Sequence, residues 1–148
     1  MSWPPHITVA VIVEEDGRFL VVEERIDGTL VVNQPAGHLE PGETLFEAAR
    51  REALEETGWE VELTGISGIY QYDSGETLYH RVTFAAAAVH HTDRPLDPDI
   101  DRACWMSPAE LASATLRSPL VLRSIEDFRA RKPVPLDFIA HVVPTSSP

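Results

Sequence analysis

Apolar runs separated by short polar turns dominate the first third of the chain. Residues 6–13 are β-branched and apolar enough for a buried strand, and a turn ending at Gly17 separates them from a similar run at 18–25. Such a pair of runs predicts a β-hairpin. A third run at 29–34 leads into 35–43, which is too rich in glycine and proline to be helical. The pattern therefore predicts a hairpin, a third strand and a loop.

The next periodic segment predicts a single helix. Thr44 and Glu47 have the spacing of a capping box, in which side chains and backbone exchange hydrogen bonds at the helix start. Gly58 is the residue type that most readily adopts the left-handed conformation at a helix end. Glu47 can also form an i,i+4 ion pair with Arg51. We therefore expect a helix from Thr44 to Gly58.

Strand-like patterns return after this helix. Residues 60–72 predict one or two strands, interrupted near Gly65 or Gly68, and residues 77–89 predict a long central strand. The following segment is mostly loop, with a short strand expected near 103–106. The second half of the chain therefore adds at least three strands.

Two shorter helices are predicted near the C-terminus. Ser107 and Ser118 are each followed by proline, an arrangement typical of a helix N-cap and first helical residue. The second helix is expected to end before Pro133, and four of its apolar residues follow helical spacing. These four are Leu120, Val121, Ile125 and Phe128.

Length and composition favour one soluble globular domain. The chain has 148 residues, of which 43% are hydrophobic and 24% are charged. We expect the domain to span residues 1–140 and residues 141–148 to form a frayed C-terminal tail. No internal repeat or long low-complexity linker interrupts the sequence.

The charge balance limits the classes of partner. The net charge is −12, with 24 acidic and 12 basic residues, and Lys132 is the single lysine. This balance argues against nucleic acid or an anionic membrane surface as the main partner. It allows a phosphorylated small molecule, provided that metal ions bridge the protein carboxylates and the phosphates.

The single cysteine and the hydropathy suggest a compartment. Cys104 has no second cysteine with which to form an intramolecular disulfide, which fits a reducing environment. No signal peptide is recognisable, and no apolar segment approaches the roughly 18 residues of a membrane span. We therefore expect a cytoplasmic protein.

Three glutamates near the end of the long helix are electrostatically costly. Glu52, Glu55 and Glu56 share one face within an arc of about 100°. The i,i+4 pair of like charges costs about 0.2–0.5 kcal/mol, and the helix macrodipole disfavours anions at this end. Glu52 and Glu56 also project into the same half of the helix as the apolar residues Leu45 and Ala49. A bound hard cation such as Mg²⁺ would neutralise carboxylates placed in this way.

Arginines and polar residues elsewhere are candidates for substrate binding. Arg25 and Arg81 could bind phosphate with two hydrogen bonds each, and Arg81 interrupts an otherwise apolar strand; an ordinary ion pair is an equal alternative. Gln34, Tyr72 and Trp105 could line a pocket for a base or pyrimidine, although core packing is the better interpretation for Trp105.

Acidic and histidine residues before the last short strand have two interpretations. Asp97, Asp99 and Asp101 alternate along a loop, and Asp99 or Asp101 could supply a further metal ligand or a base. Loop solubility is the simpler explanation for these aspartates. His90 and His91 lack a third ligand at suitable spacing, so we expect them at the surface.

The spacing of the glycines and charged residues from Gly37 to Trp59 resembles the Nudix box. That pattern is G-x5-E-x7-REU-x-EE-x-G-U, where U is bulky and apolar, and the stretch from Gly37 to Trp59 matches every glycine and charged position. The mild departures are Ala53, which is small, and Trp59, which is large and aromatic. The chain is therefore identified as a member of the Nudix superfamily.

The resemblance extends outside the box to the bacterial NudJ-type phosphatases. It is carried by PHITVA at 5–10, NQPAGHLE at 33–40 and LRSPLV at 116–121. This resemblance implies an α/β fold, an α/β/α sandwich around a mixed β-sheet in a single domain. It also implies Mg²⁺-dependent cleavage of diphosphates, with Mn²⁺ as a substitute. The implied substrates are nucleoside tri- and diphosphates, hydroxymethylpyrimidine pyrophosphate and thiamine pyrophosphate.

The resemblance also assigns roles to the box residues. Glu52, Glu55 and Glu56 would be the catalytic residues and, with the backbone carbonyl of Gly37, the metal ligands; Glu56 is the candidate base. Three further residues would be structural: Glu43, Arg51 and Gly58. Glu43 and Arg51 would form an ion pair that ties the loop to the helix, and a surface pair between Arg51 and Glu47 is equally compatible with the sequence.

Two other functions stay open at this point. One is a different Nudix pyrophosphohydrolase, such as an enzyme that removes damaged nucleoside triphosphates or cleaves ADP-ribose. The other is a non-catalytic Nudix-like binding module, although such modules generally lose a box glutamate and this chain keeps all of them. The protein is expected to be a monomer or a homodimer.

Overall fold

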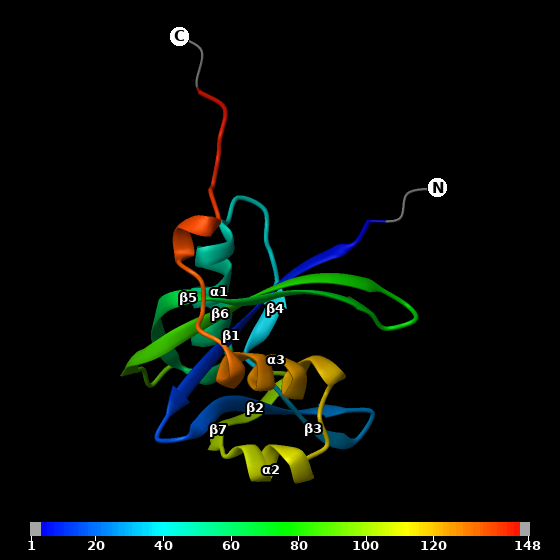
Figure 1. The fold of residues 1–148 in the computed structure, drawn as a ribbon. Helices are drawn as coiled ribbons and strands as arrows, with labels where there is room; N and C mark the ends of the chain where they lie inside the picture. The colour runs from blue at the N-terminus through cyan, green and yellow to red at the C-terminus, as the bar shows by residue number, and fades with distance from the viewer. Residues whose placement is uncertain (1–3, 146–148) are drawn as a thin grey trace.

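A seven-stranded mixed sheet forms the centre of the protein in the computed structural model, which describes residues 4–145 (Figure 1). The main strand order is β3-β2-β1-β6-β5, with β4 paired to β1 and β7 paired to β2. β1 and β6 are parallel, and the other neighbours are antiparallel. The strands are β1 His6–Glu15, β2 Arg18–Ile26, β3 Thr29–Asn33, β4 Ala36–His38, β5 Trp59–Asp73, β6 Leu78–His91 and β7 Ile100–Met106.

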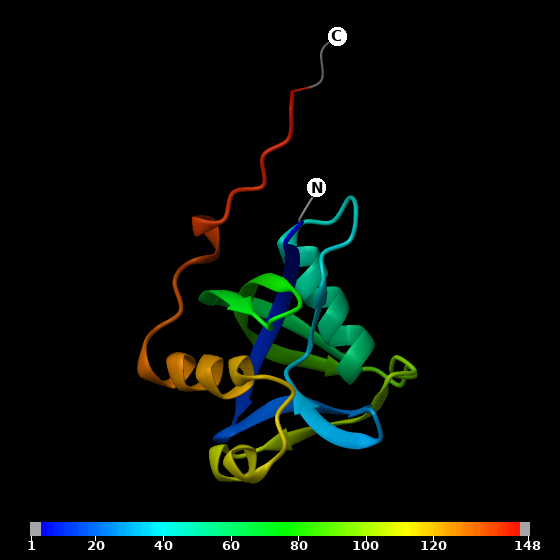
Figure 2. The same ribbon diagram turned by 90° about the vertical axis from the view of Figure 1, so that its right-hand side faces the viewer.

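Helices cover both faces of this sheet, and Figure 2 shows α1 and α3 on opposite sides of β1. The helices are α1 Leu45–Thr57, α2 Pro108–Ser113 and α3 Pro119–Ala130, followed by a single 3-10 turn, η1 Leu136–Phe138. The predicted α/β/α sandwich around a mixed sheet is confirmed. Within residues 4–145 no helix is both long enough and apolar enough to cross a membrane.

The alternation of side chains along β1 builds two cores. Val9, Val11 and Val13 face the cluster that includes the alanines of α1, whereas Ile12 faces the cluster that includes Val121 of α3. Successive side chains of a strand point to opposite faces, so a central strand covered on both sides is apolar at nearly every position. This explains the continuous apolar run at the start of the sequence.

The boundaries of α1 are set by its local sequence. Thr44 accepts a hydrogen bond from the backbone of Glu47, whose side chain in turn accepts one from the backbone of Thr44, so the predicted capping box is present. Gly58 ends the helix with φ of 76°, in the left-handed region. Each feature depends only on residues within one helical turn of it, which is why the sequence pattern alone could predict both.

Two strands differ from the sequence prediction, and a third settles an open alternative. β4 falls in the expected loop, because the edge of β1 supplies backbone partners: Val11 N–H donates to Pro35, and Leu39 N–H donates to Ile7. β7 begins at Ile100 rather than near 103, since its polar start pairs with β2 across a bulge. β5 is one strand, the first of the two alternatives that the sequence left open, with register shifts close to the two glycines that suggested a break.

The chain after α3 returns to the sheet. Val134 exchanges backbone hydrogen bonds with Ile66 of β5, at 2.8 and 2.9 Å. A Cβ on Gly65 would lie 2.7 Å from the Cβ of Pro133, so the glycine permits this close approach. Residues 141–145 form no helix or strand and are exposed, and the rest of the predicted frayed tail, 146–148, lies outside the described residues. The domain limits at 140 therefore stay a prediction.

Candidate active site

Strand β4 and the second half of α1 bring two glutamates together. The backbone N–H of Ala36 donates to Oε1 of Glu56 at 2.9 Å. A Cβ on Gly37 would lie 2.1 Å from the carboxylate carbon of Glu52, so that carboxylate occupies the space of a missing side chain. Any larger residue at position 37 would therefore force the Glu52 carboxylate to move from this position.

A third carboxylate joins them from the segment before β7. One carboxylate oxygen each from Glu52, Glu56 and Asp97 lie within 4.8 Å of one another. The backbone N–H of Asp97 donates to the carbonyl of Glu55 at 2.9 Å, which fixes this segment to the end of α1. Converging carboxylate oxygens are the donors that hard divalent cations prefer, so these residues fit Mg²⁺ or a similar ion.

The three carboxylates of the cluster disfavour one another's charge. Burial raises the pKa of Glu56 to about 8, and the charge of Glu52 adds to this rise, while the hydrogen bond from Ala36 opposes it. Burial also raises the pKa of Glu52, and the pKa of Asp97 is raised by burial and by the charge of Glu55. Each carboxyl is thus easier to protonate than usual, and a bound cation would remove this penalty.

Arg51 organises the other glutamates of the box. Its Nε and Nη2 donate to the two carboxylate oxygens of Glu43 at 2.6 and 2.8 Å, a bidentate pair. Its Nη1 donates to Glu52 at 2.7 Å and to Glu55 at 2.8 Å, and Nη2 also reaches the carbonyl of His38 at 3.0 Å. The guanidinium therefore connects the loop, β4 and α1.

These contacts show which glutamate pairs with Arg51, a choice that the sequence left open between Glu43 and Glu47. Arg51 forms the expected ion pair with Glu43, and the hydrogen bond from Arg51 lowers the pKa of Glu43. Glu47, the other possible partner, completes the capping box with Thr44. Glu55 is paired with Arg51 and is not part of the three-carboxylate cluster.

Two members of the carboxylate cluster, Glu52 and Glu56, line a polar cavity of about 970 Å³. Three arginines also line it: Arg25, Arg81 and Arg117. Side chains able to hold a cation and side chains able to hold an anion therefore face the same space. A phosphate bridged by a metal ion would match both groups.

Arg81 of β6 is the most buried of these three arginines. Its Nε donates to Thr8 Oγ1 at 3.3 Å, whereas no described residue provides a hydrogen-bond partner for its buried Nη1. Burial lowers the pKa of Arg81. A buried guanidinium nitrogen without a partner is costly, so an anionic ligand at this wall would compensate for it.

The other predicted substrate contacts lie in different environments. Arg25 is exposed at the cavity rim, and its Nε lies 3.1 Å from Asp101. Gln34 is only 1% exposed, and its amide nitrogen donates to Ser124 Oγ at 2.6 Å. Gln34 therefore packs beneath α3 and is not among the residues that line the cavity, unlike Tyr72.

The structure changes the choice of the acidic residue from outside the box. The sequence pattern favoured Asp99 or Asp101, but Asp97 is the member of the trio that joins Glu52 and Glu56. Asp99 and Asp101 line the cavity farther along the chain. Alternate residues of an extended segment are equivalent in sequence, so only the contact with α1 distinguishes Asp97.

The structure also shows where Trp105, His91 and Arg117 lie. Trp105 packs against the core and against Trp59, with ring centroids 6.0 Å apart. The ring of His91 also contacts Trp59, with centroids 5.0 Å apart. Arg117 on the cavity wall was missed by the sequence analysis. Its position immediately before the cap of α3 was the available signal, because that cap fixes the direction of the preceding residue.

Three comparisons with known proteins all find Nudix proteins. A family model described as the NUDIX domain matches residues 4–126. Phosphatase NudJ from Escherichia coli strain K12 is 44% identical over 138 residues, covering 91% of this chain and 90% of that protein. A solved NUDIX hydrolase from Nitrosomonas europaea is 43% identical, with a TM-score of 0.91 over 94% of this chain and 98% of that chain.

A more distant structure shares the fold alone. An ADP-ribose pyrophosphatase from Streptococcus suis 89-1591 is 16% identical, with a TM-score of 0.69 over 88% of this chain and 96% of that chain. The arrangement of strands and helices is thus common to proteins whose sequences have diverged widely.

Proposed function

Because the chain belongs to the Nudix family and is a hydrolase of phosphoric anhydride bonds, we propose that it uses Mg²⁺ to hydrolyse small diphosphates, as a NudJ-like phosphatase. The proposed substrates are nucleoside tri- and diphosphates and the thiamine-pathway compounds hydroxymethylpyrimidine pyrophosphate and thiamine pyrophosphate. The similarity to NudJ over most of both chains supports this choice.

One observation carries the proposal. Glu52 and Glu56 of the three-carboxylate cluster line the same cavity as Arg81, whose buried Nη1 has no partner among the described residues. A diphosphate is polyanionic, so its hydrolysis requires neutralisation of the phosphate oxygens and an activated water in line with phosphorus. Carboxylates that hold a cation and a guanidinium that holds an anion meet this requirement together.

The proposed metal ligands combine the carboxylate cluster with one ligand implied by the family resemblance. Glu52, Glu56 and Asp97 would supply carboxylate oxygens, and the backbone carbonyl of Gly37 would add a further ligand. A bound Mg²⁺ would lower the pKa of a coordinated water and neutralise phosphate charge. Mn²⁺, which accepts similar oxygen ligands, is expected to substitute.

Glu56 is the proposed base. Its Oε1 accepts the hydrogen bond from Ala36, so Oε2 is the oxygen that would face the cation or accept a proton from water. Glu55 would act through Arg51, since the two are joined at 2.8 Å. Arg51, Glu43 and Gly58 would hold the loop and helix in place.

Arg81 is the proposed contact for the phosphate nearest the metal, and Arg25 would contact the outer part of the substrate. The reason is burial: Arg81 is enclosed, whereas the Arg25 side chain is 60% exposed and pairs with Asp101. Gln34 has no place in this proposal, because its side chain is buried against Ser124. Asp99 and Asp101 would shape the rim of the cavity.

The remaining expectations concern the molecule in solution. The net charge of −12 supports a small-molecule partner rather than nucleic acid or a membrane. A cytoplasmic location and a monomeric or homodimeric state stay predictions.

A substrate panel tests the proposed function. The purified protein would be incubated with the four proposed substrate classes and with ADP-ribose, with and without Mg²⁺, and phosphate and pyrophosphate release would be measured separately. We expect Mg²⁺-dependent turnover of the proposed substrates. Hydrolysis that persists after chelation, or a clear preference for ADP-ribose, would contradict the proposal.

A further inference from the structure

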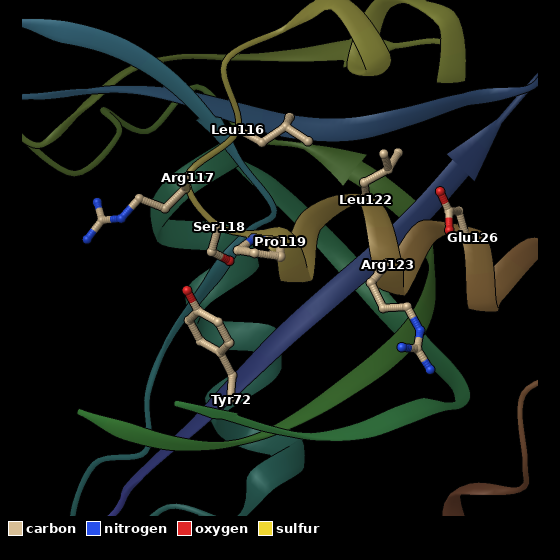
Figure 3. Close-up of a pocket in the computed structure, with 8 residues that line it drawn as sticks. All are labelled: Tyr72, Leu116, Arg117, Ser118, Pro119, Leu122, Arg123 and Glu126. Carbon is tan, nitrogen blue, oxygen red and sulfur yellow. The ribbon is translucent and has the colours of Figure 1, made fainter. Parts of the chain in front are cut away.

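A second depression adjoins the active-site cavity. This groove, of about 580 Å³, lies between the end of β5 and the start of α3 (Figure 3). Three residues line both spaces: Tyr72, Arg117 and Ser118. The groove therefore begins where the cavity ends, so one ligand could occupy both.

The groove differs from the cavity in its chemistry. Figure 3 shows the ring of Tyr72 directed from β5 toward Ser118 and Pro119, with Leu116 and Leu122 on the far side. Most of the groove surface is therefore apolar, with Arg123 and Glu126 at its far end, whereas acidic and basic groups dominate the cavity. Such a surface suits a flat ring, which gains from stacking and from burial of its faces.

Both walls of the groove are fixed before any ligand binds. Tyr72 stacks on Tyr79 of the adjacent strand, with ring centroids 6.2 Å apart and planes inclined by 19°. On the other wall, Val32 N–H donates to Thr115 and Arg117 N–H donates to Val32, each at 2.8 Å. Fixed walls reduce the entropy that binding must overcome.

Arg117 stands at the junction of the two spaces. Its Nη1 lies 3.4 Å from Glu24, a long contact, and its side chain is 46% exposed. The guanidinium is thus available to an anion that extends out of the cavity. A diphosphate held between Arg81 inside and Arg117 at the junction would direct its organic substituent into the groove.

We propose that this groove is the subsite for the non-phosphate half of the substrate and selects a planar heteroaromatic ring, with Tyr72 and Leu122 as specificity-determining residues. The inference rests on the proposed function, which it deepens by placing the ring outside the metal cavity. The groove volume lies within the range of roughly 300–1,000 Å³ usual for small-ligand pockets.

Two variants test the subsite from opposite directions. Tyr72→Ala removes the stacking surface, and Leu122→Trp fills the groove, while Tyr72→Phe keeps the ring as a conservative control. Phe138→Ala is a control for the loss of an aromatic residue, since Phe138 is 74% exposed on η1 and lines neither space. Thermal unfolding would confirm that each variant is folded.

Each protein would be assayed with two Mg²⁺-loaded substrates. One is a nucleoside diphosphate, which carries a ring, and the other is methyl diphosphate, which does not. Tyr72→Ala should lower kcat/KM for the ring substrate by about 5- to 150-fold, mainly through KM, and leave the ring-free substrate within about twofold. Leu122→Trp should show the same selectivity, and Tyr72→Phe and Phe138→Ala should resemble the wild type.

The results separate the two proposals. Equal losses on both substrates, or no loss on either, would overturn the subsite. If the wild-type protein turned over neither substrate, the proposed function would fail, and the subsite would be decided by calorimetric binding of a methylene-bridged nucleoside diphosphate. Weaker binding by Tyr72→Ala than by the wild type would then support the groove, and equal binding would overturn it.

Discussion

The side chain of Glu56 is held by a backbone hydrogen bond and lies close to two other carboxylates. This position suits the role of general base that we propose for it. Replacing it by glutamine keeps its size and its ability to accept a hydrogen bond from Ala36. We expect Glu56→Gln to lower kcat by about 10²- to 10⁴-fold, the usual contribution of a general base. Its fold should be retained, because the substitution removes a buried charge.

Steady-state kinetics with excess Mg²⁺ would measure this effect. Glu62→Gln is the matched control, because Glu62 is exposed on β5 and lies away from the cavity. A Glu56→Gln protein with wild-type kcat would exclude Glu56 as base and as an essential ligand.

Asp97 provides a second prediction, since it distinguishes three acidic residues that look alike in sequence. Asp97→Asn should weaken Mg²⁺ affinity by about 10- to 100-fold or more, because even outer-shell partners of a metal contribute that much. Asp99→Asn and Asp101→Asn should have smaller effects, since neither belongs to the cluster with Glu52 and Glu56.

The activity of each variant would be titrated with Mg²⁺ to obtain the half-saturating concentration. Asp93→Asn is a suitable control, because Asp93 is exposed in the same segment. A larger effect at Asp99 or Asp101 than at Asp97 would restore the interpretation that the sequence favoured.

These residues show where prediction from sequence succeeds and where it ends. Glu52 and Glu56 could be found because helical spacing alone places them on one face. From the sequence, Arg51 could pair with either Glu43 or Glu47. The folded loop places Glu43 beside Arg51, so the ion pair forms with Glu43. The choice of Asp97 required the backbone contact to Glu55, which no spacing reveals.

Helix α1 carries two glutamates of the carboxylate cluster, and its start depends on a reciprocal capping box. Thr44→Ala should destabilise the protein by about 1 kcal/mol, the typical cost of losing an N-cap. For a domain of this length that corresponds to a fall in Tm of about 2–4 °C. The kcat of the folded protein should stay unchanged, because Thr44 is remote from the carboxylate cluster in the helix.

Calorimetry of the variant beside Thr64→Ala, at an exposed position in β5, would measure the effect of the cap separately from the loss of a hydroxyl. Equal Tm values for the two variants would show that the cap contributes nothing.

The predictability of an element depends on the range of the interactions that form it. α1, α2 and α3 were predictable because their caps and apolar spacing are local. β4 was not, because it exists through its pairing with β1, more than twenty residues away. The polar start of β7 was hidden for a similar reason, since the ion pair between Arg102 and Glu23 joins it to β2.

Across the whole protein, the buried carboxyls couple folding to pH. The pKa of Glu56 is raised from its ordinary value near 4.5 to about 8, so the metal-free folded state binds more protons than the unfolded state in this window. The free energy of unfolding should therefore fall as pH rises from about 4.5 to about 8.

Binding of Mg²⁺ should stabilise the folded protein. At 100 times its Kd, Mg²⁺ should add about 2.7 kcal/mol to the free energy of unfolding.

Thermal unfolding in chelator and in Mg²⁺, at several pH values, would measure both effects. Glu56→Gln provides the comparison, because its metal-free stability should vary less with pH than that of the wild type. Identical pH profiles for the two proteins would show that Glu56 does not titrate differently in the folded state.

Arg51 already donates to Glu52 and Glu55 through one nitrogen, so the chain carries its own counter-ion at the edge of the carboxylate cluster. This internal cation would share the neutralising task with a bound metal, and it holds the glutamates in place beforehand. Synthesis of the protein and loading of its metal can accordingly be separate events. Apoprotein prepared in a magnesium-depleted medium should be recoverable in a native state and become active when the ion is supplied.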